Sequence, residues 1–172
     1  MQNDNNETDQ LIKRNKDAIC KVAYSYLKNM DDASDAYQTV FFNYYKNKPN
    51  FDNVEHEKAW FIRTTINVCK NMRTSAWHKK VDYLNDSETF DRIPVEAQVS
   101  ENEESYGIVT KAVLRLPEKY RIVVHLFYYE EYTVEQIAKI LDITRTNVKV
   151  RLNRARNLIK NDLVSTKKNH DL

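Results

Sequence analysis

The chain has 172 residues, of which 41% are hydrophobic and 30% charged, and it contains one glycine and three prolines. This length allows one ordinary domain or two small ones. So few turn-forming residues disfavour a β-rich fold, and an aromatic share of 11% is too high for a disordered chain. The composition therefore predicts an all-α protein.

The formal net charge is only +2, but the charge is unevenly distributed. Residues 82–104 are acidic, whereas residues 145–160 carry six basic side chains and no carboxylate. An acidic block and a basic block in one chain predict separate surfaces for different partners.

The N-terminal residues do not indicate export, and the apolar segments do not indicate a membrane span. The first ten residues, MQNDNNETDQ, lack the apolar core of a secretion signal, and no apolar run approaches about 18 residues. Cys20 and Cys69 lie in helical apolar patterns and are expected to be reduced core residues. We therefore expect a cytoplasmic protein, and with no metal-ligand spacing among its histidines and cysteines we expect no metal or cofactor.

Three helices are predicted in residues 8–80. The first covers residues 8–30, and a break at Asp31-Asp32 lets Asp32 cap the second. The turn KPNFDN, residues 48–53, then precedes a third helix from about residue 55 to 77. The second helix is expected to turn these side chains inward: Ala33, Ala36, Tyr37, Val40, Phe41 and Tyr44.

The third helix has a tryptophan on its polar face. Phe61, Thr65 and Cys69 share the apolar side, whereas Trp60 lies with Arg63 and the residues that follow it on the polar side. One interpretation is that Trp60 packs against the preceding loop. The other is that it stacks on unpaired bases, because exposed aromatics among basic and amide side chains bind single strands in this way.

Residues 81–106 are predicted to be an acidic linker, because the helical periodicity fades there and Pro94 interrupts the segment. They separate a first helical domain, residues 8–80, from a second, residues 107–165. In the second domain Ile108, Val109 and Leu116 are expected to belong to the core. Pro117 is expected in the first turn of a helix that buries Tyr120, Val123, Val124, Phe127 and Tyr128.

The end of the second domain has the pattern of a helix-turn-helix. Thr133 and Gln136 form a capping box, Ala138 allows close helix packing, Asp142 opens a tight turn, and Thr144 caps a basic helix. The alternative is a solvated basic face on an ordinary helical hairpin. In the helix-turn-helix interpretation, base edges would be read by Arg145, Thr146, Asn147, Lys149 and Asn153, and phosphates bound by Arg151, Arg154 and Arg156.

Three stretches, in this order, resemble the bacterial RNA polymerase sigma factors of the short, two-domain, extracytoplasmic-function class. They are DDASDAYQTVFFNYYKN, FDNVEHEKAWFIRTTINVCKNMR and LPEKYRIVVHLFYYEEYTVEQIAKILDITRTNVKVRLNRAR. The resemblance covers nearly the whole chain. Three departures stand out: Thr39 replaces a frequent Glu, Asp142 replaces a frequent Gly, and the segment TSAWHKK carries a thinner basic cluster, which leaves the strength of DNA melting open.

The resemblance implies a role for each matching residue. A helix bearing Asp32, Ala33, Asp35, Gln38 and Phe41 would dock on the clamp coiled coil of the polymerase. Trp60 would wedge at the upstream edge of the melted −10 element. Residues 51–58 would receive a flipped base, and the acidic linker would thread the RNA exit path. The implied −10 contacts are Phe51, Asp52, Asn53, Trp60, Arg63, Thr64, Asn67, Lys70 and Arg73, and the implied −35 contacts include Lys149, Val150 and Asn153.

The expected function is therefore that of a non-catalytic transcription initiation factor. Its partners would be the clamp and flap of core RNA polymerase, promoter DNA, and an anti-sigma protein, soluble or membrane-bound. The alternative is a stand-alone helix-turn-helix regulator, which would not need the Asp35/Gln38 surface or Trp60. An enzyme is the weakest alternative, because the sequence has no Gly-rich phosphate loop and no metal-ligand cluster.

Overall fold

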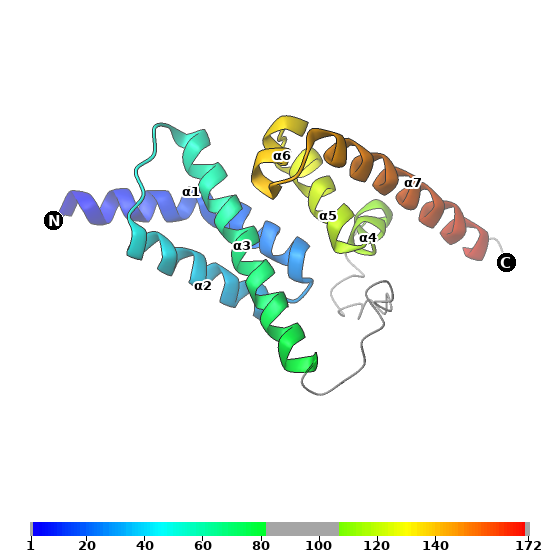
Figure 1. Ribbon diagram of the computed structural model, residues 1–172, viewed down its shortest axis with the longest axis horizontal. Coiled ribbons are helices and arrows are strands. Elements are labelled where there is room, and N and C mark those ends of the chain that lie inside the picture. Colours follow the sequence, from blue (N-terminus) through cyan, green and yellow to red (C-terminus); the bar gives the residue numbers. More distant parts are fainter. Residues whose placement is uncertain (1, 82–106, 171–172) are drawn as a thin grey trace. The chain divides into compact units, whose positions relative to one another are not determined.

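The computed structural model describes residues 2–81 and 107–170, and every element in these ranges is a helix (Figure 1). This confirms the all-α prediction. The chain forms two compact units that divide within residues 82–106. The predicted acidic linker lies outside the described residues, and each unit is described by itself.

The first unit is a three-helix body. Helices α1 (Gln2–Leu27), α2 (Met30–Asn47) and α3 (Val54–Val81) all contact one another, and α3 crosses the other two (Figure 1). The predicted inward face of α2 is buried at Ala33, Ala36, Val40 and Phe41. The apolar face of α3 closes the core with these buried residues: Phe61, Ile62, Thr65, Ile66, Val68 and Cys69.

The break between α1 and α2 comes earlier than predicted. Lys28 adopts a left-handed conformation (φ 55°), and its N–H donates to the Tyr24 carbonyl at 2.8 Å. Asn29 is the N-cap of α2, and its side-chain oxygen accepts from the Asp32 N–H at 2.9 Å. The prediction that Asp32 caps this helix was wrong, because Asn caps as well as Asp and Asn29 stands directly after the left-handed turn.

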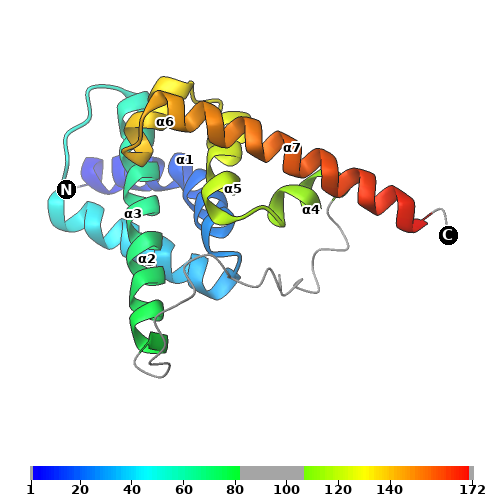
Figure 2. The ribbon, with the colours of Figure 1, turned by 45° about the vertical axis from the view of Figure 1, so that its right-hand side comes forward.

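The second unit contains α4 (Ile108–Leu114), α5 (Glu118–Val124), the π-helix η2 (His125–Tyr129), α6 (Val134–Leu141) and α7 (Arg145–His170). The long helix α7 packs against α4, α5 and α6, and Figure 2 shows α6 beside its N-terminal end. The core gathers residues from all these elements: Ala112, Leu116, Ile122, Val123, Leu126, Ile137, Ala138, Val148, Leu152 and Ala155.

The π-helix changes which side chains α5 and its continuation bury. The Glu130 N–H donates to the His125 carbonyl five residues back at 3.2 Å, so the turn is wider than in an α-helix. Leu126 is fully buried as a result, whereas Tyr128 is 51% exposed. The prediction that Tyr128 is buried was wrong because regular α-helical periodicity does not continue through this segment. Pro117 is the N-cap of α5 rather than part of its first turn.

The helix-turn-helix is confirmed in α6 and α7. Thr133 and Gln136 form both hydrogen bonds of the capping box. Asp142 is left-handed (φ 55°) in the turn, and Thr144 accepts from the Asn147 N–H at 3.1 Å. A short polar side chain such as that of Asp tolerates this conformation. Within the described ranges, none of the helices has the length and hydropathy needed to cross a bilayer.

Candidate nucleic-acid and partner interfaces

Helix α2 presents most of the predicted docking residues on its surface. Asp32, Asp35 and Gln38 are exposed. Phe41 is only 7% exposed, and its ring packs against Tyr37 at 4.8 Å and Phe61 at 5.4 Å between centroids. Phe41 therefore packs α2 onto the core of the first unit.

Two aromatic residues extend this surface, and the sequence interpretation missed both. Phe42 and Tyr45 are 66% and 52% exposed. Their spacing from Asp35 and Gln38 is that of one helix face. The signal was present in FFNYY, where apolar residues continue past the inward positions. We call Asp35, Gln38, Phe42 and Tyr45 the docking stripe.

Trp60 is half-buried within an aromatic cluster. Its ring centroid lies 5.8 Å from Phe51, 6.3 Å from Tyr44 and 5.0 Å from Phe61. The expected packing against the preceding loop is therefore present, and part of the indole remains accessible beside it. Stacking of Trp60 on an unpaired base stays a prediction.

The polar face of α3 continues from Trp60. Arg63, Asn67 and Lys70 are exposed and Thr64 is half-buried. Arg73 is also exposed, and its Nη2 donates to the Tyr26 carbonyl at 3.2 Å near the end of α1. The structure thus brings four basic or amide-bearing candidates and Thr64 onto one helix, and Arg73 has a structural contact as well.

The loop before α3 is held by local hydrogen bonds. Asn53 accepts from the His56 N–H at 2.8 Å, which caps the helix, and the Asp52 N–H donates to His56 Nδ1 at 3.3 Å. Phe51 is half-buried and packs edge-on against His56 at 5.7 Å. Asp52 and Asn53 remain exposed at the tip.

The first turns of α7 present the predicted base-reading residues. Arg145, Thr146, Lys149 and Asn153 are exposed, and Val150 is 41% exposed. The half-buried Asn147 accepts from Arg151 Nε at 2.9 Å, so these two side chains orient each other. A hydrogen bond from Arg154 lowers the pKa of the Tyr120 hydroxyl.

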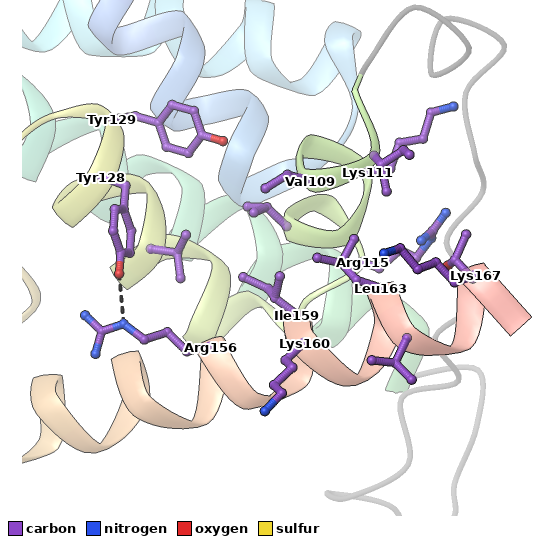
Figure 3. A pocket seen from close by; sticks show the side chains of 15 residues that line it. Val109, Lys111, Arg115, Tyr128, Tyr129, Arg156, Ile159, Lys160, Leu163 and Lys167 are labelled. Atoms are coloured by element: carbon purple, nitrogen blue, oxygen red, sulfur yellow. Dashed lines mark hydrogen bonds between the residues drawn. The ribbon is translucent and has the colours of Figure 1, made fainter.

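Arg156 lines a groove of the second unit. Its Nε donates to the Tyr128 hydroxyl at 2.8 Å (Figure 3). Its guanidinium lies 6.0 Å from the Phe127 ring centroid. The sequence placed Arg156 among the phosphate contacts. That role stays a prediction. The structure adds the hydrogen bond from Arg156 to Tyr128 at the groove.

The groove lies between α4, η2 and the second half of α7 and has a volume of about 1370 Å³ (Figure 3). Ile108 and Val109 are 66% and 57% exposed along it, so the prediction that they belong to the core was wrong. Arg115 Nη1 bonds Asp162 Oδ2 at 2.8 Å and ties α4 to α7. No lining residue in the described part of the chain carries a carboxylate, and the basic ones are Lys111, Arg115, Arg156, Lys160 and Lys167.

Two family models match the chain. The model described as Sigma-70 region 2 matches residues 11–79, and the model described as Sigma-70, region 4 matches residues 106–159. The first match covers α3 and its exposed polar face, and the second covers the helix-turn-helix. Each model falls within one of the two structural units.

Several known proteins are similar to this chain over most of its length. The ECF RNA polymerase sigma factor SigW of Bacillus subtilis (strain 168) is 29% identical over 160 residues, which cover 86% of this chain and 84% of SigW. The RNA polymerase sigma factor SigV of the same strain is 28% identical over 153 residues, covering 87% and 86%. A solved structure of the sigma factor RpoE in complex with the anti-sigma factor NepR from Bartonella quintana has the same fold, with a TM-score of 0.65 and 21% identity over 91% of this chain and 96% of that one.

Proposed function

This chain belongs to the sigma-70 family, as a transcription initiation factor of the extracytoplasmic-function class that directs RNA polymerase, and we propose which surface performs each part of that function. It carries out no chemical step in this scheme, because polymerisation belongs to the partner enzyme. It acts where that enzyme acts, in the cytoplasm. The stand-alone regulator is not favoured, since the region 2 match accounts for the first unit.

The first unit binds the polymerase clamp through α2. The exposed Asp32, Asp35 and Gln38 supply polar contacts, and Phe42 and Tyr45 supply apolar area along the same helix face. An exposed aromatic patch beside polar groups is typical of a protein interface. We include these two aromatic residues in the docking surface.

The first unit also captures the opened −10 element with α3 and its preceding loop. The observation that carries this proposal is the half-buried Trp60 at the head of the exposed stripe formed by Arg63, Asn67 and Lys70. An aromatic face can stack on a base while cationic side chains bind the backbone. Residues 51–53 then hold a base that leaves the stack.

The second unit reads the −35 element in duplex form. Recognition helices of helix-turn-helix proteins read base edges with side chains near their N-terminal ends, and side chains in the first turns of α7 are exposed. Lys149 and Asn153 are suited to guanine and adenine, respectively. The apolar groove with its basic rim is the surface that meets the polymerase flap.

An anti-sigma protein is a further proposed partner. The RpoE neighbour was solved with such a protein, and the docking stripe of this chain offers exposed aromatic area that an inhibitor would cover in competition with the polymerase. Copurification from unstressed native cells tests this proposal. Recovery of the chain only free or on polymerase would show that it is controlled in another way.

Run-off transcription with purified core polymerase tests the function as a whole. The template is the DNA upstream of the gene that encodes this chain, and the control template has a scrambled −35 element. We expect a discrete transcript only when both the chain and the intact template are present. Binding to the DNA without any transcript would instead support the stand-alone regulator.

A further inference from the structure

A partly buried charged cluster joins α1 to the start of α3. Arg14 Nε donates to Glu57 Oε1 at 2.7 Å and Nη2 to Oε2 at 2.5 Å, while Asn15 Nδ2 donates to Oε1 at 2.5 Å and to the Leu11 carbonyl at 3.0 Å. Glu57 is only 4% exposed and Asn15 only 3%. Both carboxylate oxygens are therefore satisfied from α1.

The cluster keeps Glu57 ionised inside the unit. Burial acts to raise the pKa of this carboxyl, but the hydrogen bonds from Arg14 and Asn15 outweigh it, so the pKa of Glu57 lies below its ordinary value. Buried ion pairs contribute little net stability compared with apolar packing. A bidentate pair does, however, fix the relative orientation of the two groups it joins.

The position of Glu57 links this fixed orientation to the DNA-facing loop. The Glu57 N–H donates to the Asn53 carbonyl at 3.1 Å in the first turn of α3, directly after the loop tip. Trp60 follows within one helical turn, and its ring packs on Phe51 of the same loop. A rotation of this first turn would therefore shift the Trp60 face and the loop tip together.

We propose that Arg14, Asn15 and Glu57 are positioning residues for base capture, holding the loop and Trp60 in the arrangement that receives an unpaired base. This inference rests on the proposed role of the first unit in strand opening. The cluster touches no DNA itself. Its contribution is to selectivity, because a base is discriminated only by groups held in a fixed geometry.

The test compares Glu57→Gln with Asp17→Asn in the holoenzyme. Asp17 is exposed on α1 and makes none of the hydrogen bonds of the cluster, so its substitution removes one carboxylate charge without touching the cluster or the loop. The probes are single-stranded oligonucleotides of the −10 element of the promoter used for run-off transcription, with each of the four bases at every position in turn. At one position of the −10 element, the affinity for the best base exceeds that for the worst base by some ratio. We expect Glu57→Gln to reduce this ratio of affinities by about tenfold, because small misplacements of binding groups have large effects. Core binding and duplex binding should stay unchanged in Glu57→Gln, and the base ratio should stay unchanged in Asp17→Asn.

Arg14→Lys is the second variant, and all measurements are made where circular dichroism shows folded protein. Lysine at this position keeps the positive charge but cannot form the two parallel hydrogen bonds of arginine. Because the Arg14 side chain is 41% exposed, the fold should tolerate this substitution more easily than Glu57→Gln. Unchanged base ratios in both variants would overturn the inference, as would an equal loss in core, duplex and single-strand binding. If the unmodified holoenzyme shows no base preference on single strands, the proposed capture function fails as well. A preserved preference in the variants removes only the positioning role.

Discussion

Trp60 combines an observed packing contact with a proposed DNA contact in one side chain. Its ring touches Phe51, Tyr44 and Phe61 while part of it stays accessible. Truncation to Ala would remove both contributions at once. Trp60→Leu separates them better, because Leu keeps apolar contact with the cluster but has no aromatic face.

We expect Trp60→Leu to leave closed-complex binding nearly intact and to reduce the open-complex population about tenfold. The lost stacking, about 1–3 kcal/mol, applies only once bases are unpaired. Permanganate footprinting on duplex and pre-melted bubble templates measures this, and the bubble should recover most of the loss. Trp60→Phe is the matched control and should lose less. Equal damage on both templates would identify Trp60 as a packing residue.

Glu57 makes the stability of the first unit depend on acid. Its folded pKa is lowered by Arg14 and Asn15 despite burial, so its contribution is present above the unfolded value of about 4.3 and is lost as pH falls through the folded value. At pH 7 we expect Glu57→Gln to lower the free energy of unfolding by about 1–3 kcal/mol. Urea titrations at pH 7 and at about pH 3 should show that the difference in free energy of unfolding between the unmodified chain and Glu57→Gln becomes smaller in acid. A difference independent of pH would contradict the ionised state of Glu57.

At the scale of the element, helix α2 carries the docking stripe on the face opposite its buried residues. Alanine at both Asp35 and Gln38 should weaken core-polymerase binding without unfolding the chain, because exposed positions cost little stability. Phe42→Ala with Tyr45→Ala should weaken it further, by about 1–2 kcal/mol for each lost aromatic contact. Pull-down and thermal melting together measure both effects. Intact core binding in the folded variants would count against this docking surface.

Helix α7 should divide its residues between base reading and backbone binding. Lys149→Ala and Asn153→Ala are expected to relax −35 preference by about 1–3 kcal/mol per contact. Arg154→Ala should lower affinity for all sequences and reduce the salt dependence. Binding-site selection at two salt concentrations distinguishes these effects. The assignment is wrong if Arg154→Ala alters preference and the other two do not.

For the molecule as a whole, sequence periodicity predicted the helices well where local signals agreed. The capping box at Thr133 and Gln136, the tight turn at Asp142 and the cap at Thr144 were all confirmed, because each depends on residues within a few positions. Two of the errors came from features without a local signal. A π-turn rotated Tyr128 outward, and Ile108 and Val109 line a groove rather than the core.

The candidate site was predicted less completely than the fold. The exposed positions of Asp35, Gln38, Arg63 and Lys149 follow from helical spacing and were anticipated. The Arg14–Glu57 pair joins residues 43 positions apart, and no period in the sequence relates them. Such long-range polar contacts depend on how α1 packs on α3, which the sequence pattern alone does not specify.

Covalent joining of the two units should account for much of the promoter affinity. Each unit has its own core, so residues 1–81 and residues 107–172 are expected to fold as separate fragments. The second should bind −35 duplex alone, and the first should bind core polymerase. Added together in trans, they should support run-off transcription about 100-fold less well than the intact chain, because joining two binding modules raises the effective concentration of the second by about this order or more. Raising the fragments toward millimolar concentration should recover part of the signal. Equal activity of fragments and intact chain at micromolar concentration would show that the units engage the polymerase and promoter independently.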